Sequence, residues 1–443
     1  MEDNGMTRGI SKINTEVRKM AKGLKKIGFG LVAVGLSIAL LLTVALPVCE
    51  AGPNERVVKI GIGSIFTGPA ASQGCPACEG ILDYARYVNE QGGINGIKIE
   101  VPWYEAAFMI PRVVVAYRRL IEQGILMFLS SPLDAAIALL PRAQKDGIPL
   151  NFVDALMAGS VTRPQWILVT LSEWPATFVM TMKWVKENLW TEARPMRVGM
   201  IFYDTGAGWA SLDGVKYLDK IGVEFVGYET VPLIGCIDTS TELLRLAAKK
   251  ADCIFMVSYG SPSVVIVKDA KRLEIQQKGI KLIATANSLD HNILSIVGKD
   301  ADGWYADKGT PCYFETERFP GLKIMIEKAK EYRGYKPKET DGFYAVGWAH
   351  AAVAVEAIRL AIEDVGYENL TGRAVRDALF SGRIKDLDIG TLPPITITES
   401  TPWIVNSFWI CEIREGDFHP IGRPEALPSI YITPDEVERA LER

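Results

Sequence analysis

The sequence has few of the residues, and none of the short motifs, on which most metal, hydrolase and kinase sites depend. Only three histidines are present, His291, His350 and His419, which leaves little material for a histidine-based metal site. No G-x-x-x-x-G-K-[ST], H-E-x-x-H or G-x-S-x-G pattern occurs. We therefore expect no metal and no cofactor.

One pair of glycines matches part of a dinucleotide-binding fingerprint. Gly61 and Gly63 follow the first expected strand, but Phe66 stands where the third glycine of G-x-G-x-x-G belongs. Without that glycine, the backbone cannot approach a pyrophosphate closely. A strand end and a turn explain the glycines, and no nucleotide cofactor is expected.

A basic stripe and a second long apolar run are also missing. Acidic residues outnumber basic ones by 53 to 49, which disfavours nucleic acid as a partner. The one long apolar run, Ile27–Val48, follows Lys25 and Lys26 and ends before Cys49. A basic flank before such a run indicates an export signal or a membrane anchor. We expect residues 1–49 to fill that role, with the remainder extracytoplasmic, in the periplasm or at the cell surface.

Three interpretations of this run stay open. Leu46-Pro-Val-Cys49 resembles a lipobox, in which Cys49 is lipidated and becomes the first residue of a lipoprotein. Cleavage after Ala51 is the second interpretation. An uncleaved span is the third, because the 22 residues of the run would cross about 30 Å of hydrocarbon as a helix. The first and third interpretations anchor the protein to the membrane through its N-terminus.

Two of the seven cysteines are closely spaced. Cys75-Pro-Ala-Cys78 opens an expected helix, and a helix dipole lowers the thiol pKa in redox-active C-x-x-C sites. The flanking pattern is unlike that of a thioredoxin-like domain, so we expect a local disulfide or two packed thiols. As a metal site the motif is incomplete, because no second C-x-x-C exists.

Short β-branched runs alternate with amphipathic helix patterns, which predicts an α/β fold of parallel strands covered by helices. The expected strands form two series and a late addition: Val57–Gly63, Ile97–Trp103, Ile125–Leu129 and Ile148–Val153; Arg197–Tyr203, Val223–Val231, Cys253–Ser258 and Lys281–Ala286; and Ile404–Arg414. Two series predict two doubly wound lobes, and ligands bind such lobes at the carboxyl ends of the strands.

Two segments resemble the opening of a known family: Ile60–Gly74 (IGIGSIFTGPAASQG) and Val88–Gly96 (VNEQGGING). They are similar to the type I periplasmic solute-binding proteins of ABC importers that are related to the leucine/isoleucine/valine-binding protein. The similarity covers about residues 57–415 and includes Ser130-Ser131 after the third strand.

The resemblance implies two α/β lobes joined by three hinge crossings. Lobe I is then expected at residues 57–172 and 304–395, and lobe II at 173–303 and 396–432. It further implies a protein without enzymatic activity that captures a small solute and delivers it to the permease and ATPase subunits of an ABC transporter. A membrane-anchored sensing ectodomain with the same clamp is the alternative, and a redox enzyme using the C-x-x-C is a third hypothesis.

The expected ligand-binding residues lie in the first turn and helix or follow strand ends: Phe66, Thr67, Gln73, Ser130, Ser131, Asp134, Asp154, Tyr203, Trp209, Tyr259, Asn287 and Asp290. Aromatic side chains would pack the body of the solute, hydroxyls and amides would orient it, and acids would hold a positive end.

The chain departs from the family's pattern for amino acids at two places. Relatives that bind α-amino acids hold the carboxylate with hydroxyls after the third and fourth strands, but residues 133–136 and 154–156 have none. Ala286 stands where an acidic residue usually holds the ammonium group. A branched-chain amino acid is therefore not favoured. Asp134 and Asp154 favour a cationic or donor solute, such as an amine or amide, unless they only cap helices or turns.

Overall fold

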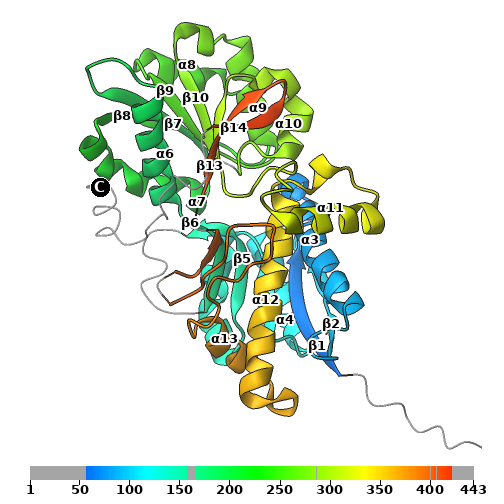
Figure 1. The fold of residues 1–443 in the computed structure, drawn as a ribbon. Helices are drawn as coiled ribbons and strands as arrows, with labels where there is room; N and C mark the ends of the chain where they lie inside the picture. Colours follow the sequence, from blue (N-terminus) through cyan, green and yellow to red (C-terminus); the bar gives the residue numbers. More distant parts are fainter. Residues whose placement is uncertain (1–55, 157–165, 286, 400, 406, 422–443) are drawn as a thin grey trace, which may run out of the picture. The chain divides into compact units, whose positions relative to one another are not determined.

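The computed structural model describes the chain from residue 56 to residue 421 with four gaps: 157–165, 286, 400 and 406. Of strand residues 154–156 and 171–173 it describes the backbone only. Residues 1–49, with the expected signal or anchor and Cys49, lie outside the described part. The described residues form two seven-stranded sheets with helices between the strands, so the expected α/β class is confirmed (Figure 1).

The first sheet is parallel throughout, in the order β12-β6-β5-β4-β1-β2, with β3 also beside β1. Its strands are β1 Val57–Ser64, β2 Lys98–Glu100, β3 Trp103–Glu105, β4 Met127–Ser130, β5 Leu150–Leu156, β6 Ile167–Glu173 and β12 Trp403–Val405. The expected strand Ile97–Trp103 is thus divided into β2 and β3. Pro102 lies at the division, where it has no N–H to offer the ladder and accepts a hydrogen bond from Ile62 instead (3.0 Å).

The second sheet has the order β14-β13-β11-β10-β9-β7-β8 and is parallel except at β13 and β14. Its strands are β7 Met196–Tyr203, β8 Val223–Val231, β9 Cys253–Val257, β10 Lys281–Thr285, β11 Tyr305–Lys308, β13 Trp409–Arg414 and β14 Asp417–Ile421. All five residues of β9 (CIFMV) are buried. A parallel strand covered on both faces requires such a continuous apolar run.

The helices follow the strands in the alternating order that the sequence predicts. In chain order they are α3 Ala71–Glu90, α4 Ile110–Ile121, α5 Leu133–Asp146, α6 Trp174–Asn188, α7 Gly206–Ala210, α8 Ser240–Ala248, α9 Ser261–Arg272, α10 His291–Val297, α11 Pro320–Arg333, α12 Phe343–Val365 and α13 Gly372–Leu379. Short 3₁₀ helices add η2 Ser211–Ile221, η3 Gln276–Lys278, η4 Gly298–Ala301, η5 Pro337–Thr340 and η6 Tyr367–Asn369. The helical segment between β7 and β8 is therefore mostly 3₁₀.

The chain passes between the two sheets three times, after β6, after β11 and after β12. The second and third passages differ from the expected lobe bounds. Tyr305–Lys308 was assigned to lobe I but lies parallel beside β10, and Trp403–Val405 was assigned to lobe II but lies parallel beside β6. The expected strand Ile404–Arg414 is accordingly two strands in different sheets. β12 pairs with β6 at the edge of the first sheet, and β13 pairs with β11 in the second.

Helices α3 and α12 pack with their backbones in contact. A Cβ added at Gly80 would lie 2.2 Å from the carbonyl oxygen of Tyr344, and one at Gly347 would lie 1.9 Å from that of Ala77. Helix α12 is long and apolar enough to cross a membrane, but 83% of its most apolar window is buried, as is typical of a core helix. This packing fixes α3, whose first turns carry Gln73 and the two closely spaced cysteines.

Candidate functional site

The carboxyl ends of strands from both sheets border two cavities that share Val153 and Phe343. The apolar cavity is lined by Ile62, Gly63, Ile65, Ala70, Gln73, Gly74, Ala77, Cys78, Ile81, Phe108, Ser130, Ser131, Val153, Tyr259 and Phe343. The polar cavity is lined by Val153, Thr170, Asn287, Asp290, His291, Lys308, Gly309, Thr310, Asp341, Gly342, Phe343, Val346 and Phe418. Strand ends are where parallel α/β sheets bind ligands, so these cavities form the candidate site.

Ser130 and Ser131 reach the apolar cavity, but their hydroxyls are used by the backbone. Ser130 Oγ donates to the carbonyl of Gly63 (2.7 Å), and Ser131 Oγ donates to that of Val153 (3.2 Å). The helix that follows begins after Pro132, which has no N–H to offer a ligand. Ser130 and Ser131 therefore form part of the cavity wall but offer a solute no free hydroxyl donor.

Gln73 connects α3 to two loops of the second sheet. Its buried side chain donates to the carbonyl of Asn287 (2.5 Å) and accepts from the backbone N–H of Gly260 (3.2 Å). Nearby, Asn292 donates to the carbonyl of Ser72 at the start of α3 (2.8 Å). These hydrogen bonds hold the carboxyl ends of β9 and β10 against the helix that follows β1.

Tyr259 lies between the two sides of the apolar cavity. Its ring is buried, with ring centroids 5.6 Å from Tyr203, 6.0 Å from Phe108 and 6.0 Å from Phe343. Aromatic rings at these distances pack edge to face or tilted and add to the stabilisation from burial. Tyr259 therefore forms an aromatic wall that any apolar solute body in this cavity would contact.

Asp134 and Tyr203 line a third cavity, beside Phe108 and Leu233. Burial raises the pKa of Asp134, and a hydrogen bond from the backbone N–H of Gly206 partly offsets that rise. Asp134 is therefore placed against the start of α7 on the second sheet. It does not line the polar or the apolar cavity.

Three other expected residues lie away from both cavities. Thr67 is exposed, and its backbone N–H and hydroxyl donate to Glu105 (3.1 and 3.0 Å), while Phe66 packs on Trp103 (5.0 Å). Trp209 is 43% exposed and donates through Nε1 to Asp204 (2.7 Å). The side chain of Asp154 lies outside the described residues.

A buried ion pair that the sequence did not suggest lies in the polar cavity. Lys308 Nζ contacts Asp341 Oδ1 (2.5 Å), and it also donates to the carbonyls of Thr310 and Pro311 and to the Thr310 hydroxyl. Burial alone would lower the pKa of Lys308, but Asp341 outweighs it and raises the pKa. The other oxygen of Asp341 has no hydrogen-bond partner.

Asp290 and His291 begin α10 on the second-sheet side of the polar cavity. Asp290 Oδ1 caps the helix by accepting from Ile293 N (2.7 Å), whereas Oδ2 has no partner. Burial raises the Asp290 pKa to about 7, although Ile293 and Gln73 favour its charged form. Burial also lowers the pKa of His291, which keeps the imidazole neutral near pH 7.

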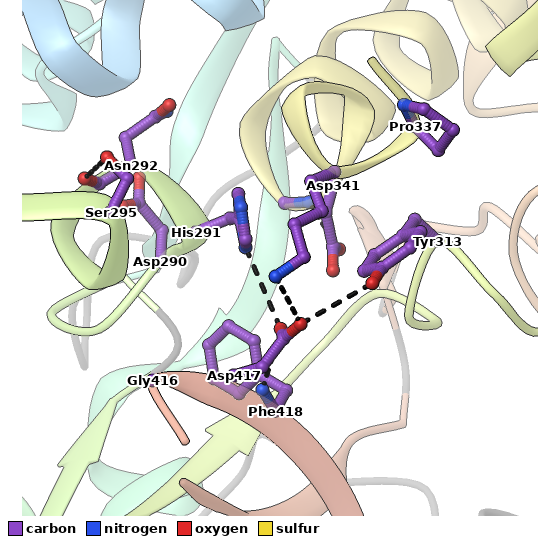
Figure 2. Close-up of polar contacts among 12 residues, drawn as sticks. Asp290, His291, Asn292, Ser295, Tyr313, Pro337, Asp341, Gly416, Asp417 and Phe418 are labelled. Carbon is purple, nitrogen blue, oxygen red and sulfur yellow. Dashed lines mark hydrogen bonds and ion pairs between the residues drawn. The ribbon is translucent and has the colours of Figure 1, made fainter. Parts of the chain in front are cut away.

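Asp417, at the start of β14, precedes Phe418, which lines the polar cavity. Figure 2 shows His291 and Tyr313 directed toward the Asp417 carboxylate, at 3.9 and 3.4 Å. Lys338 also forms an ion pair with Asp417 (2.7 Å), and it lowers the Asp417 pKa against the effect of burial. Asp417 is therefore charged and paired, unlike Asp290.

Sequence reasoning missed Lys308, Asp341 and His291. Lys308 and Asp341 stand 33 positions apart, and Lys308 is the last residue of a strand that the sequence placed in the other lobe. A lysine at a strand end, directly after Asp307 and before Gly309, was the available signal. Nothing in the local pattern of Asp341 distinguishes it from a turn residue.

Cys75 and Cys78 are free thiols, so the structure does not contain the local disulfide considered from the sequence. They lie one turn apart on α3, and Cys78 is buried against the apolar cavity. Burial raises the thiol pKa to about 11 for Cys75 and about 12 for Cys78, which disfavours the reactive thiolate. Within the described residues no cluster of His, Cys, Asp and Glu could hold a metal ion.

Comparison with known proteins identifies the class. A family model described as periplasmic binding protein matches residues 57–417, and the chain belongs to this family. The Leu/Ile/Val-binding protein homolog 7 of Brucella abortus (strain 2308) is 22% identical over 331 residues, which are 72% of this chain and 80% of that relative.

Solved structures agree with this class. A branched chain amino acid ABC transporter protein from Thermus thermophilus with bound valine superposes with a TM-score of 0.75 at 20% identity, covering 88% of this chain and 99% of that one. A solute binding protein of an ABC transporter from R. palustris, in complex with 4-hydroxybenzoate, has a TM-score of 0.70 at 17% identity, with coverages of 83% and 96%. At these identities the likeness establishes the fold.

Proposed function

We propose that this chain is the extracytoplasmic substrate-binding component of an ABC importer. It captures a small solute, such as an amino acid, an amide or a related compound, and delivers it to a membrane permease. The observation that carries the proposal is the pair of cavities bordered by strand ends of both sheets. Membership of the periplasmic binding protein family and the solutes named for its structural neighbours support it.

The geometry gives capture a mechanism. The three passages between the sheets act as the hinge of two lobes, and the lobes close over the solute. Gln73 and Asn292 hydrogen-bond across the two sides, and Val153 and Phe343 line both cavities. A solute that contacts both lobes stabilises the closed state, which the permease then recognises. The N-terminal segment exports the protein and, in the lipoprotein or uncleaved form, tethers it to the membrane.

Titration against a broad panel of small solutes tests the proposal. The panel includes amino acids, amides, amines and aromatic or aliphatic acids, and binding is measured by isothermal titration calorimetry and thermal shift. We expect at least one solute class to bind with 1:1 stoichiometry. Tyr259→Ala should weaken that binding because it removes the aromatic wall, while Trp209→Ala, an aromatic change outside both cavities, should not. A folded protein that binds nothing in the panel refutes capture.

A further inference from the structure

The contrast between the two cavities indicates the chemical class of the solute. We infer that the solute is an amine without a carboxylate, whose amino group binds Asp341 and Asp290 and whose apolar body fills the apolar cavity. This inference rests on the proposed function, because it names what the binding protein captures.

Asp290 and Asp341 each offer one carboxylate oxygen that no protein group satisfies. In both, Oδ1 is used, by Ile293 N in Asp290 and by Lys308 Nζ and Gly342 N in Asp341, while Oδ2 is buried without a partner. Figure 2 shows Asp290 at the start of α10 and Asp341 just before α12, and both line the same cavity. A buried acceptor left unpaired costs free energy. An ammonium group carries three donors and can supply a donor that these oxygens lack.

The charges around the polar cavity favour a cation. Lys308 is neutralised by Asp341, and Asp417 by Lys338 (2.5 and 2.7 Å). Asp290 has no cationic partner among the described residues, so an incoming ammonium group would supply the missing charge. A buried carboxylate is stabilised mainly by such a paired, hydrogen-bonded charge.

A carboxylate on the solute would find the two serine hydroxyls and the Lys308 ammonium of these cavities already used. Ser130 and Ser131 donate to backbone carbonyls, and Lys308 Nζ already contacts four oxygens. Such a solute would also place its charge near Asp290 and Asp341. An α-amino acid would therefore bind more weakly than the amine with the same side chain.

The apolar cavity determines the body of the solute. Ile62, Ile65, Phe108, Tyr259 and Phe343 contribute aliphatic and aromatic walls to it. It meets the polar cavity at Val153 and Phe343, so one molecule can extend from one cavity into the other. A branched aliphatic or an aryl chain attached to the amino group fits this arrangement.

Matched probes separate the head group from the body. The first set is isoamylamine, 4-methylpentanoate, 4-methylpentanamide and leucine, and the second is 2-phenylethylamine, 3-phenylpropanoate and phenylalanine. Each is titrated calorimetrically into residues 56–443 purified with the fold checked by circular dichroism, and into the full chain in detergent. We expect the amines to bind at least tenfold more tightly than the acids and the amino acids.

Variants test the two carboxylates. Asp290→Asn keeps an oxygen for the helix cap but removes the charge, and Asp341→Asn does the same beside Lys308. Each should weaken amine binding tenfold or more, whereas Asp219→Asn, an exposed change on η2, should leave it unaltered. If Asp341→Asn does not fold, Asp290→Asn alone decides.

The outcomes distinguish this inference from the function on which it rests. Tight binding of acids or amino acids with no binding of amines overturns the inference but leaves solute capture intact. Amine binding that survives both Asp→Asn changes also overturns it. Silence of the wild-type protein toward these probes and the broad panel refutes the proposed function itself.

Discussion

At Gly260, a single added methyl group should weaken closure of the two lobes without preventing the protein from folding. It follows β9 and has φ +58° and ψ −132°, a conformation that L side chains rarely adopt. A Cβ there would lie 2.4 Å from the carbonyl oxygen of Pro69, which belongs to the turn after β1. Gly260→Ala therefore strains the contact between the two sides of the cleft.

The magnitude follows from these two observations. The backbone conformation costs an alanine about 1–3 kcal/mol. The methyl group also needs about 1 Å more space, since ordinary contacts begin near 3.4 Å. In an open arrangement the added methyl group would be free of Pro69 and the backbone could relax, so most of the cost falls on the closed state. A loss of about 1.4–2.8 kcal/mol from the closed state weakens solute binding by about 10- to 100-fold.

The assay pairs affinity with closure. Solute affinity is measured by calorimetry, and the compactness of the ligand-free protein by small-angle scattering. Gly279→Ala is the matched control, because Gly279 also has a positive φ (+82°) but a Cβ there would meet nothing within 4 Å. The control should lower stability by about 1 kcal/mol and leave affinity unchanged. If Gly260→Ala binds solute as tightly as wild type, the contact with Pro69 does not govern closure.

Three further changes test the packing and the buried charges. Gly80→Ala should lower the free energy of unfolding by about 1–3 kcal/mol in urea titrations, because backbone of α12 occupies the space; an unchanged midpoint would contradict this close packing. Asp290 has a folded pKa raised from 3.8 to about 7, so its contribution to stability is full below about pH 4 and is lost as pH rises toward 7. The difference in the free energy of unfolding between Asp290→Asn and wild type should therefore favour the variant more at pH 8 than at pH 5. An equal difference at both pH values would refute the raised pKa of Asp290. Lys308→Met should cost about 3–5 kcal/mol because it leaves Asp341 buried and unpaired, and the double variant with Asp341→Leu should recover most of the loss in the same titrations.

The alternation of strand and helix patterns predicted the fold because parallel strands buried on both faces leave a strong signal. β1 and β9 are nearly continuous apolar runs, and both appear where they were expected. The predicted strand bounds were wrong where contacts with distant parts of the chain determine them. Pro102 interrupts one expected strand, and Ile404–Arg414 pairs with two different sheets on either side of residue 406. The local sequence pattern does not indicate which of the two sheets a strand will join.

The candidate site was predictable in position but not in detail. Ser130, Ser131, Gln73, Tyr259, Asn287 and Asp290 follow strand ends or begin a helix, and all line the two cavities. The sequence could not show that the serine hydroxyls donate to Gly63 and Val153, since those contacts join separate strands. It also could not show that Asp134 faces Gly206 instead of the cavities.

The unpaired oxygens of the polar cavity connect stability to solute binding. Asp290 comes from the second sheet's α10, whereas Asp341 comes from the segment that returns the chain toward the first sheet. Each leaves a buried oxygen without a donor, at a cost of about 1–3 kcal/mol. Opening the cleft would let water reach both oxygens and remove this cost, so the ligand-free protein gains from being open. A donor that bridges both carboxylates removes the same cost without opening. A solute that satisfies them would therefore shift the equilibrium toward closure by its interactions with the closed state alone.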